Sequence, residues 1–287
     1  MMLIEPSNTT IIYRPITEND LPAAHALSQA LRWPHRLEDW QFVLRLGAGF
    51  VAEADGTVIG TALCWQQRER HGTVGMIIVS AQHQGKGIGR ELMQRVLDQL
   101  GERCTHLIAT QAGQPLYERL GFQPTGTICQ HQGTLTGFPA TQLPAGASVR
   151  LAEPGDLAAI IALADRGAGM SRGDVLKQLV TVAEGAVLER DGQLAGFALL
   201  RRFGRGQVIG PLVAPDTDSA KALIAHWSDA CAGAFVRLDV SGDSGLGDWL
   251  AQAGLAQVDS GVAMSRNGAP EADPALRQFA IINQALC

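Results

Sequence analysis

Blocks of apolar and polar positions along the chain predict short strands alternating with amphipathic helices. Residues 73–80 (TVGMIIVS) form an apolar run, which is typical of a buried strand. Residues 87–100 follow with apolar side chains at helical spacing, on a stripe formed by Ile88, Leu92, Met93, Val96, Leu97 and Leu100. A strand at 105–110, a short helix at 115–121 and a strand near 122–129 come next. This succession predicts a mixed α/β layer architecture.

The same pattern occurs twice. Residues 13–27 match residues 149–163 without a gap, and the same offset of 136 positions places residues 51–63 over 187–199. Both members of the second pair contain an Asp-Gly dipeptide, which predicts a hairpin turn. Two distant segments that share one offset indicate a duplicated domain.

We therefore predict an N-terminal domain at 1–141 and a C-terminal domain at 149–266, joined by a linker around QLPAGAS at 142–148. The turn-forming residues RNGAPEADP at 266–274 predict a loop. We expect a short helix to follow it, within a C-terminal tail at 267–287.

Composition limits the partners of the chain. Its 287 residues, 46% of them hydrophobic, suffice for two cores, and its net charge of −5 argues against a nucleic-acid partner. No apolar run approaches the ~20 residues of a membrane span, and the N-terminus does not resemble a signal peptide. Five widely spaced cysteines without metal-ligand spacing predict reduced thiols and no metal site. We expect a cytoplasmic protein without a membrane partner, and the sequence leaves a homodimer open.

The stretch QHQGKGIGRELM at 82–93 joins the apolar strand to the amphipathic helix. At such a helix N-terminus, free backbone N–H groups and the positive end of the helix dipole face an anion. Lys86, one of only three lysines, and Arg90 add positive charge. The stretch therefore suits a diphosphate, although a plain strand-to-helix turn is the alternative. The Walker pattern GxxxxGK[ST] is missing, and a Rossmann fingerprint is disfavoured because no acidic residue closes the next strand.

The segment MIIVSAQHQGKGIGRELM, followed by PLYERLGF, resembles the GNAT superfamily of N-acetyltransferases. In that family an Arg/Gln-x-x-Gly-x-Gly/Ala loop binds acetyl-CoA, and the next helix often carries a tyrosine before x-x-Gly-Phe. The resemblance spans about residues 10–130, and the duplication is similar to the tandem bacterial members. It implies two GNAT-like domains, each a mixed, mostly antiparallel sheet flanked by helices, and acetyl-CoA-dependent transfer of an acetyl group to an amine.

The resemblance also implies which residues bind the cofactor. Backbone groups of Ile77, Ile78 and Val79 would contact the pantetheine arm. The pyrophosphate would be held by the loop and the helix start, which comprise Gln84, Gly85, Lys86, Gly87, Ile88, Gly89 and Arg90. Tyr117 would protonate the departing thiolate, because a phenol of pKa ~10 is a suitable proton donor to a thiol of pKa ~8.5. Packing of its helix on the sheet is the alternative role of Tyr117.

The second copy departs from this pattern. APDTDSAKAL at 214–223 replaces the glycine loop, and Asp216 and Asp218 would repel a diphosphate. Leu250 stands where the first copy has Tyr117. We therefore expect one acetyl-CoA per chain, bound by the first copy, with the second copy shaping the acceptor pocket.

The catalytic base is unassigned, because the strand at 73–80 lacks the glutamate that many relatives place there. His71, Glu69 and Asp39 are candidates that also suit solvated surface positions. Asp239, in an apolar strand of the second copy, is interpreted as structural.

Acceptor recognition is expected from the loop ALRWPHRLEDW at 30–40, where Trp33 could form a pocket wall or anchor the loop. Met170 and Arg172 lie in the counterpart of this loop in the second copy, and an arginine suits a substrate carboxylate. The acceptor expected is an amino acid or another small amine. A protein lysine or a drug as acceptor, and an acetyl-CoA sensor without turnover, are alternatives.

Overall fold

The structure, a computed structural model, describes residues 10–143 and 145–287. The first nine residues of the predicted N-terminal domain and Pro144 of the predicted linker lie outside the described residues. The chain divides into two compact units. Unit 1 comprises the chain up to Trp65 together with Val74–Gly101. Unit 2 comprises Gln66–Thr73 together with Glu102–Cys287.

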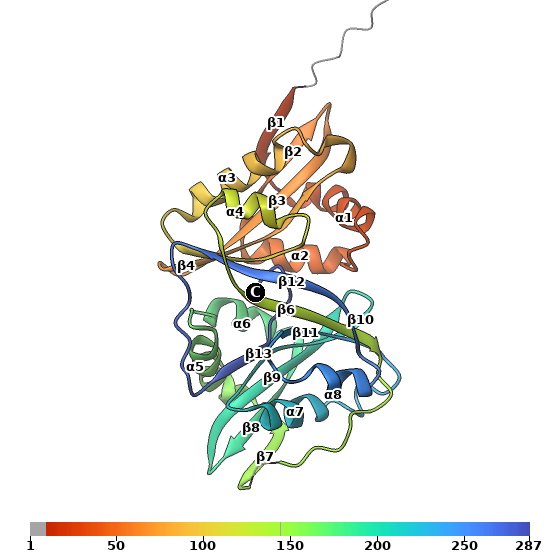
Figure 1. Cartoon of the computed structure of the whole chain (residues 1–287), viewed down its shortest axis with the longest axis vertical. Coiled ribbons are helices and arrows are strands. Elements are labelled where there is room, and N and C mark those ends of the chain that lie inside the picture. The colour runs from red at the N-terminus through yellow and green to blue at the C-terminus, as the bar shows by residue number, and fades with distance from the viewer. Residues whose placement is uncertain (1–9, 144) are drawn as a thin grey trace, which may run out of the picture. The chain divides into compact units, whose positions relative to one another are not determined.

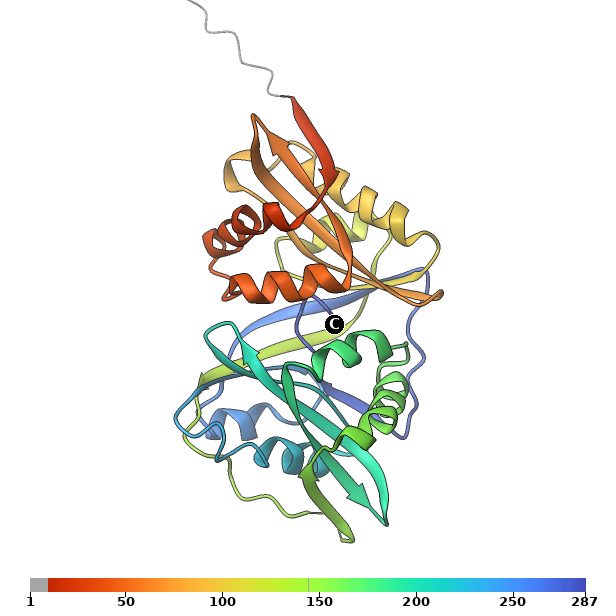
Figure 2. The ribbon, with the colours of Figure 1, turned by 180° about the vertical axis from the view of Figure 1, so that it is seen from behind.

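Unit 1 is a sheet with helices on both faces. Its strands are, in order across the sheet, β1 (Ile11–Pro15), β2 (Ala48–Ala54), β3 (Thr57–Gln67) and β4 (His71–Val79), the last two of which extend into unit 2. Helices α1 (Leu21–Ala30) and α2 (Leu37–Leu46) cover one face, and α3 (Ile88–Leu100) covers the other (Figure 1 and Figure 2). All six apolar residues of the stripe predicted for α3 are buried, which confirms the helix and its orientation.

Unit 2 contains the remaining elements. Its helices are α4 (Gln114–Arg119), α5 (Leu157–Ala168), α6 (Gly173–Leu179), α7 (Thr217–Ala225) and α8 (Gly247–Gln252). Its strands are β5 (Cys104–Ala109), β6 (Gln123–Thr134), β7 (Ala147–Leu151), β8 (Ala183–Arg190), β9 (Gln193–Phe203), β10 (Gly206–Ala214), β11 (Phe235–Ser241), β12 (Ala256–Arg266) and β13 (Arg277–Ala280). They follow the order β4-β5-β12-β6-β11-β13-β10-β9-β8-β7. Only the β4–β5 and β10–β11 pairs are parallel among the registers described, so the sheet is mixed and mostly antiparallel.

A repeated ion-pair motif confirms the duplication in three dimensions. In unit 1, Arg14 donates from Nη2 to Asp20 and to Glu53, both at 2.7 Å. The same three-residue arrangement recurs 136 positions later in unit 2, with Arg150, Asp156 and Glu189. Each arginine ties the first strand of its copy to the turn before the first helix, so one physical device positions that helix in both copies.

Replacing Asp20 by asparagine is expected to lower the free energy of unfolding by about 1–2 kcal/mol at pH 7. Hydrogen bonds from Arg14 lower the pKa of this carboxyl to about 2, and its side chain is only 7% exposed. A lowered pKa means that the stabilisation is present above the unfolded-state value near 4 and is lost as the pH falls toward 2. Urea unfolding between pH 2 and 7 measures this difference.

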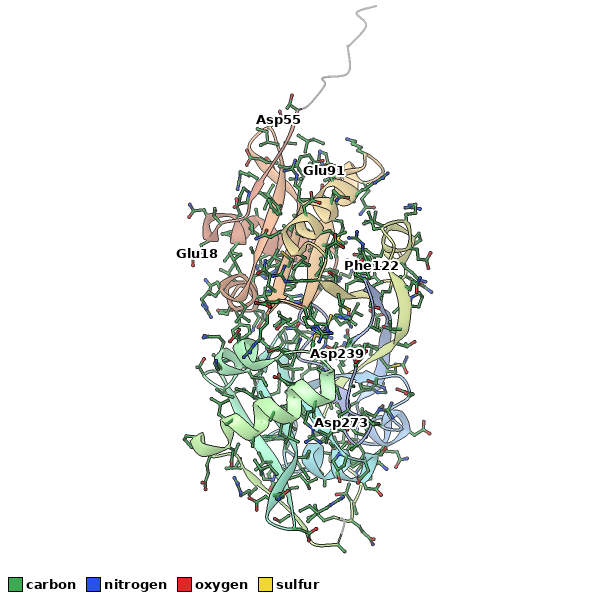
Figure 3. All side chains as sticks on the ribbon, turned by 90° about the vertical axis from the view of Figure 1, so that its left-hand side faces the viewer. Glu18, Asp55, Glu91, Phe122, Asp239 and Asp273 are labelled. Atoms are coloured by element: carbon green, nitrogen blue, oxygen red, sulfur yellow. The ribbon has the colours of Figure 1, made fainter. Side chains whose placement is uncertain are left out.

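The exposed Glu18 of the same turn provides the control for this prediction. Glu18→Gln should leave the stability at pH 7 nearly unchanged, because this exposed side chain (Figure 3) makes no ion pair with Arg14. Equal losses in the two variants would show that the ion pair with Arg14 contributes nothing specific.

The last strands of the two copies are exchanged. β12 of the second copy lies between β5 and β6 of the first, paired antiparallel to both. β6 in turn pairs with β11 over seven residues, from Ile128 to Thr134. Consequently β5, α4 and β6, which belong to the first copy in sequence, lie in the same compact unit as the second copy.

The predicted C-terminal helix is wrong, because the segment after the loop at 266–274 forms strand β13. Leu212 of β10 pairs with Ala280, and Val240 of β11 pairs with the same residue, so β13 fills the space between these two strands. The backbone hydrogen bonds available there favour an extended strand over a helix. Within residues 10–143 and 145–287, the helices lack the combination of length and apolar character that a membrane span requires.

Candidate functional site

The glycine stretch forms an open loop between β4 and α3. Gly85 has a φ of 76° and Gly87 a φ of 81°, a left-handed conformation that L side chains rarely adopt. A Cβ added to either glycine would meet no atom within 4 Å. The Gln84 side chain donates to the Val79 carbonyl at 3.1 Å and ties the loop to the end of β4. The two glycines are therefore required by backbone conformation and leave the loop open to a ligand.

The N-terminus of α3 presents backbone donors to that loop. Glu91 N–H makes the first bond of the helical pattern, to the Gly87 carbonyl at 3.1 Å. The amides of Ile88, Gly89 and Arg90 precede it, and helix geometry gives them no intrahelical acceptor. Unpaired amides and the positive end of the helix dipole together form an anion site. Lys86 and Arg90 are exposed and increase the positive charge there.

Strand β4 contains an irregularity that the sequence did not indicate. Met76 is buried, yet its φ is 54°, and its carbonyl accepts a hydrogen bond from Thr61 Oγ1 at 2.7 Å. A buried non-glycine residue in this conformation is strained, and such strain concentrates at functional sites. Ile77, Ile78 and Val79, the predicted pantetheine contacts, follow directly on the same strand.

Tyr117 lies on α4, in unit 2, and is 6% exposed. Its ring packs edge-on against Phe122, with centroids 6.1 Å apart. A Cβ on Gly113 would come within 3.0 Å of Tyr117 Cε2, so a glycine there allows the ring its position. Burial raises the pKa of the phenol to about 12, which keeps Tyr117 protonated at neutral pH.

Comparison with known proteins identifies the family. The model of the acetyltransferase (GNAT) family matches residues 15–122, and that of the acetyltransferase (GNAT) domain matches residues 160–280. The two matches together span most of the chain. The chain belongs to the GNAT superfamily of N-acetyltransferases.

Relatives of known sequence or structure share this assignment. An uncharacterized N-acetyltransferase of Bacillus subtilis, YitH, is 29% identical over 75% of the chain and 76% of its own length. The L-amino acid N-acyltransferase MnaT of Escherichia coli is 32% identical over 31% of the chain and 59% of its own length.

Solved structures show the same tandem fold. The fold superimposes on a putative acetyltransferase of Pyrococcus horikoshii with a TM-score of 0.78 at 19% identity, covering 100% of this chain and 99% of that one. A tandem GNAT protein from the clavulanic acid biosynthesis pathway gives a TM-score of 0.64 at 14% identity, with coverage of 91% and 100%. The predicted fold of two GNAT domains is therefore confirmed, and the chain is an N-acetyltransferase.

Acetyl-CoA is the acyl donor of GNAT domains. The residues of the first copy suit its diphosphate in charge and space, because open glycines, unpaired amides and two cations meet at the N-terminus of α3. The predicted cofactor residues from Ile77 to Arg90 lie in unit 1, whereas Tyr117 lies in unit 2.

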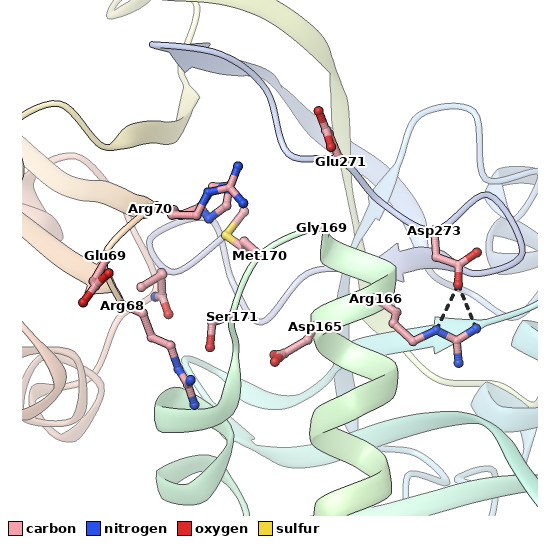
Figure 4. Close-up of a pocket in the computed structure, with 12 residues that line it drawn as sticks. Arg68, Glu69, Arg70, Asp165, Arg166, Gly169, Met170, Ser171, Glu271 and Asp273 are labelled. Atoms are coloured by element: carbon pink, nitrogen blue, oxygen red, sulfur yellow. Dashed lines mark hydrogen bonds and ion pairs between the residues drawn. The ribbon is translucent and has the colours of Figure 1, made fainter.

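The predicted acceptor residues have different environments. Trp33 is half-buried in the loop between α1 and α2, with its ring 5.8 Å from that of His35. Met170 is 9% exposed and lines a cavity in unit 2 (Figure 4). Arg172 is buried, and its Nη2 donates to the carbonyls of Leu286, at 2.9 Å, and Cys287. The guanidinium of Arg172 therefore holds the final residues of the chain, which argues against its predicted contact with a substrate carboxylate.

The structure separates the three candidates for the base and places Asp239 in the interior. Asp39 is buried, accepts a hydrogen bond from the Arg36 amide at 2.9 Å and forms an ion pair with the Arg36 guanidinium. These contacts cap the start of α2 at Leu37, so the loop predicted at 30–40 is shorter than expected. Asp239 is fully buried, and the Arg237 guanidinium donates to both of its oxygens. Glu69 is exposed and His71 half-buried, and both line the cavity of unit 2. Asp39 and Asp239 thus have structural roles.

The second copy has a different helix start at the corresponding position. Asp216 caps α7 by accepting a hydrogen bond from Ser219 N–H at 2.7 Å, and it pairs with Arg190 at 3.3 Å. A carboxylate thus occupies the end of the helix where the first copy offers free amides. Asp218 in the first turn is exposed and adds a second negative charge.

Proposed function

We propose that the chain transfers an acetyl group from acetyl-CoA to the amine of a small metabolite, and that the first copy binds the cofactor. The N-terminus of α3 carries this proposal, because its left-handed glycines leave free amides facing open space. Acetyl-CoA supplies the thioester whose acetyl group reaches the amine. The backbone of Ile77, Ile78 and Val79 orients the pantetheine arm, and the loop from Gln84 to Arg90 binds the pyrophosphate.

Tyr117 is proposed as the general acid. Its phenol retains a proton at neutral pH because burial raises its pKa, and that proton is available to a departing thiolate. The amine must also lose a proton, and none of the three candidate bases is assigned to that step.

The strand pairing of the second copy supports a single cofactor site per chain. Leu212, Val213 and Ala214 end β10, as Ile77, Ile78 and Val79 end β4. These three residues pair with β13, so strand pairing already engages their backbone. Pro211 follows Gly210 in the second copy at the place where Met76 follows Gly75 in the first. Because proline has no backbone N–H, this position cannot donate a hydrogen bond to a ligand.

A calorimetric titration is expected to find about one acetyl-CoA per chain. The variant Asp218→Ala, which removes a charge near the start of α7, should bind the cofactor as the native protein does. Two molecules per chain, or an altered affinity in Asp218→Ala, would contradict a single site in the first copy.

An amino acid or another small amine is proposed as the acceptor. The relative MnaT, an L-amino acid N-acyltransferase by name, supports an amino acid. Release of free thiol from acetyl-CoA, measured with amino acids, simple amines and lysine-containing peptides, tests this. Turnover with peptides alone would favour a protein substrate, and turnover with none would favour a sensor without activity.

A further inference from the structure

The buried hydroxyl of Thr61 reaches the backbone of the neighbouring strand. Thr61 lies on β3 and is 0% exposed, and its Oγ1 donates to the Met76 carbonyl of β4 at 2.7 Å. Both residues belong to unit 1. Side chains project from the faces of a sheet, whereas the carbonyls of a regular strand lie in its plane and point to the adjacent strands. The Met76 carbonyl is therefore turned out of that plane, toward the face on which Thr61 lies.

This hydrogen bond favours an otherwise unfavourable conformation of Met76. With a φ of 54°, the backbone of Met76 is left-handed, and the Cβ of an L residue is crowded there. Such a residue persists where its surroundings hold it in place. Met76 is 3% exposed, so its carbonyl depends on a donor from the protein rather than on water. Thr61 supplies that donor, and its removal would favour a return of Met76 to an extended conformation.

The left-handed residue divides β4 into two parts. Before Met76, residues His71, Gly72 and Thr73 pair in parallel with β5. Beyond Met76, the described part of the chain shows no pairing of residues 77–79 with β5. A strand edge without pairing presents its N–H and C=O groups to a ligand. Residues 77–79 are the proposed contacts of the pantetheine arm, so the conformation of Met76 bears directly on the proposed cofactor site.

The second copy lacks the corresponding hydroxyl. The offset of 136 residues places Phe197 at the position of Thr61, and Pro211 stands where the first copy has Met76. Phe197 is 0% exposed, and the pairing of β10 with β9 also contains a shift of register. A phenylalanine side chain cannot donate a hydrogen bond. An irregular strand thus occurs in both copies, whereas the hydroxyl accompanies the copy proposed to bind the cofactor.

We propose that Thr61 is a positioning residue for acetyl transfer. Its hydroxyl holds Met76 in the left-handed conformation, and this conformation keeps the backbone of residues 77–79 unpaired and available to the pantetheine arm. Thr61 acts through Met76 rather than by contact with the cofactor, because its side chain is fully buried. This role rests on the proposed function, since it concerns the same cofactor site.

The variant Thr61→Val tests this role, because valine preserves the shape of the side chain and removes the hydroxyl. Calorimetric titration of this variant should show an affinity for acetyl-CoA roughly tenfold below that of the native protein. Thr61→Ser keeps the hydroxyl and loses a methyl group, so its affinity should stay within about threefold of native. A residue needed only for packing would give the opposite order, with the serine variant the more impaired.

Thr73→Val is the matched control on the same strand. Thr73 is also 0% exposed, and its hydroxyl has no hydrogen-bond partner among the described residues. Valine makes the same chemical change there without breaking a hydrogen bond and should leave the affinity for acetyl-CoA unchanged. Thr61→Ala also lacks the hydroxyl and should lose at least as much affinity as Thr61→Val, so the test does not depend on the folding of one variant. Thermal unfolding identifies the variants that are folded during the titration.

Comparison with Gly87→Glu, which places a carboxylate in the glycine loop, separates the role of Thr61 from the cofactor site. Lost affinity in Gly87→Glu together with native affinity in Thr61→Val would overturn the positioning role and leave the site intact. Native affinity in both variants would contradict the site itself, and with it the role of Thr61. The positioning role is also overturned if Thr61→Ser or Thr73→Val loses as much affinity as Thr61→Val.

Discussion

The variant Gly87→Glu is expected to lose more than roughly 100-fold of the affinity for acetyl-CoA. Gly87 has a φ of 81°, where any side chain is strained by roughly 1–2 kcal/mol. The larger effect is electrostatic, because the new carboxylate would stand at the N-terminus of α3, next to the amides of Ile88 and Gly89, where the pyrophosphate is proposed to bind. Calorimetry or displacement of a fluorescent CoA analogue measures the loss.

Gly56→Glu is the matched control for this variant. Gly56 follows Asp55 in the β2–β3 turn at the tip of unit 1, has a φ of 75° and also leaves open space around a Cβ (Figure 3). The control adds the same charge and similar strain to the same unit without touching the loop. Unchanged binding in Gly56→Glu together with lost binding in Gly87→Glu would place the cofactor at the N-terminus of α3. Equal losses of affinity in the two variants would contradict that site.

The variant Tyr117→Phe is expected to lower turnover by roughly 10²–10⁴ while acetyl-CoA affinity changes little. Phenylalanine preserves the ring that packs against Phe122 and beside Gly113, so only the proton donor is lost. With the pKa of Tyr117 raised to about 12, native kcat should show no loss from this group as the pH rises from 7 to 10. Steady-state kinetics across that range test both statements.

The chain contains only one other tyrosine, Tyr13 on β1. Tyr13→Phe should leave kcat unchanged and so serves as the control. Native turnover in Tyr117→Phe would assign the residue to packing of α4, and a parallel loss of acetyl-CoA affinity would assign it to cofactor binding instead.

Local patterns predicted those parts of the fold that depend on neighbouring residues. The apolar run of β4, the six-residue stripe of α3 and the Asp-Gly turns each depend on a short window of sequence, and the structure confirms them. Arg14 and Asp20 recur as Arg150 and Asp156 within the matched segments that predicted the duplication. The structure gives the physical reason, because the same ion pair forms in both copies.

Long-range pairing explains what the sequence left out. The segment of β13 was expected to be a helix. Its extended backbone is favoured by pairing with the distant strands β10 and β11, which a short window of sequence does not reveal. Arg172 was predicted to contact a substrate. Its actual partner, the Leu286 carbonyl, is 114 residues away and leaves no local sequence pattern that could have revealed the contact. The conformation of Met76 is similarly invisible, since methionine gives no signal for a left-handed backbone.

The exchange of β6 and β12 gives the second copy a structural role that does not depend on cofactor binding. A gene encoding the first copy alone would produce a protein whose β5 lacks its neighbour β12, leaving a bare strand edge prone to aggregation. Neither half is therefore expected to fold as a stable protein on its own.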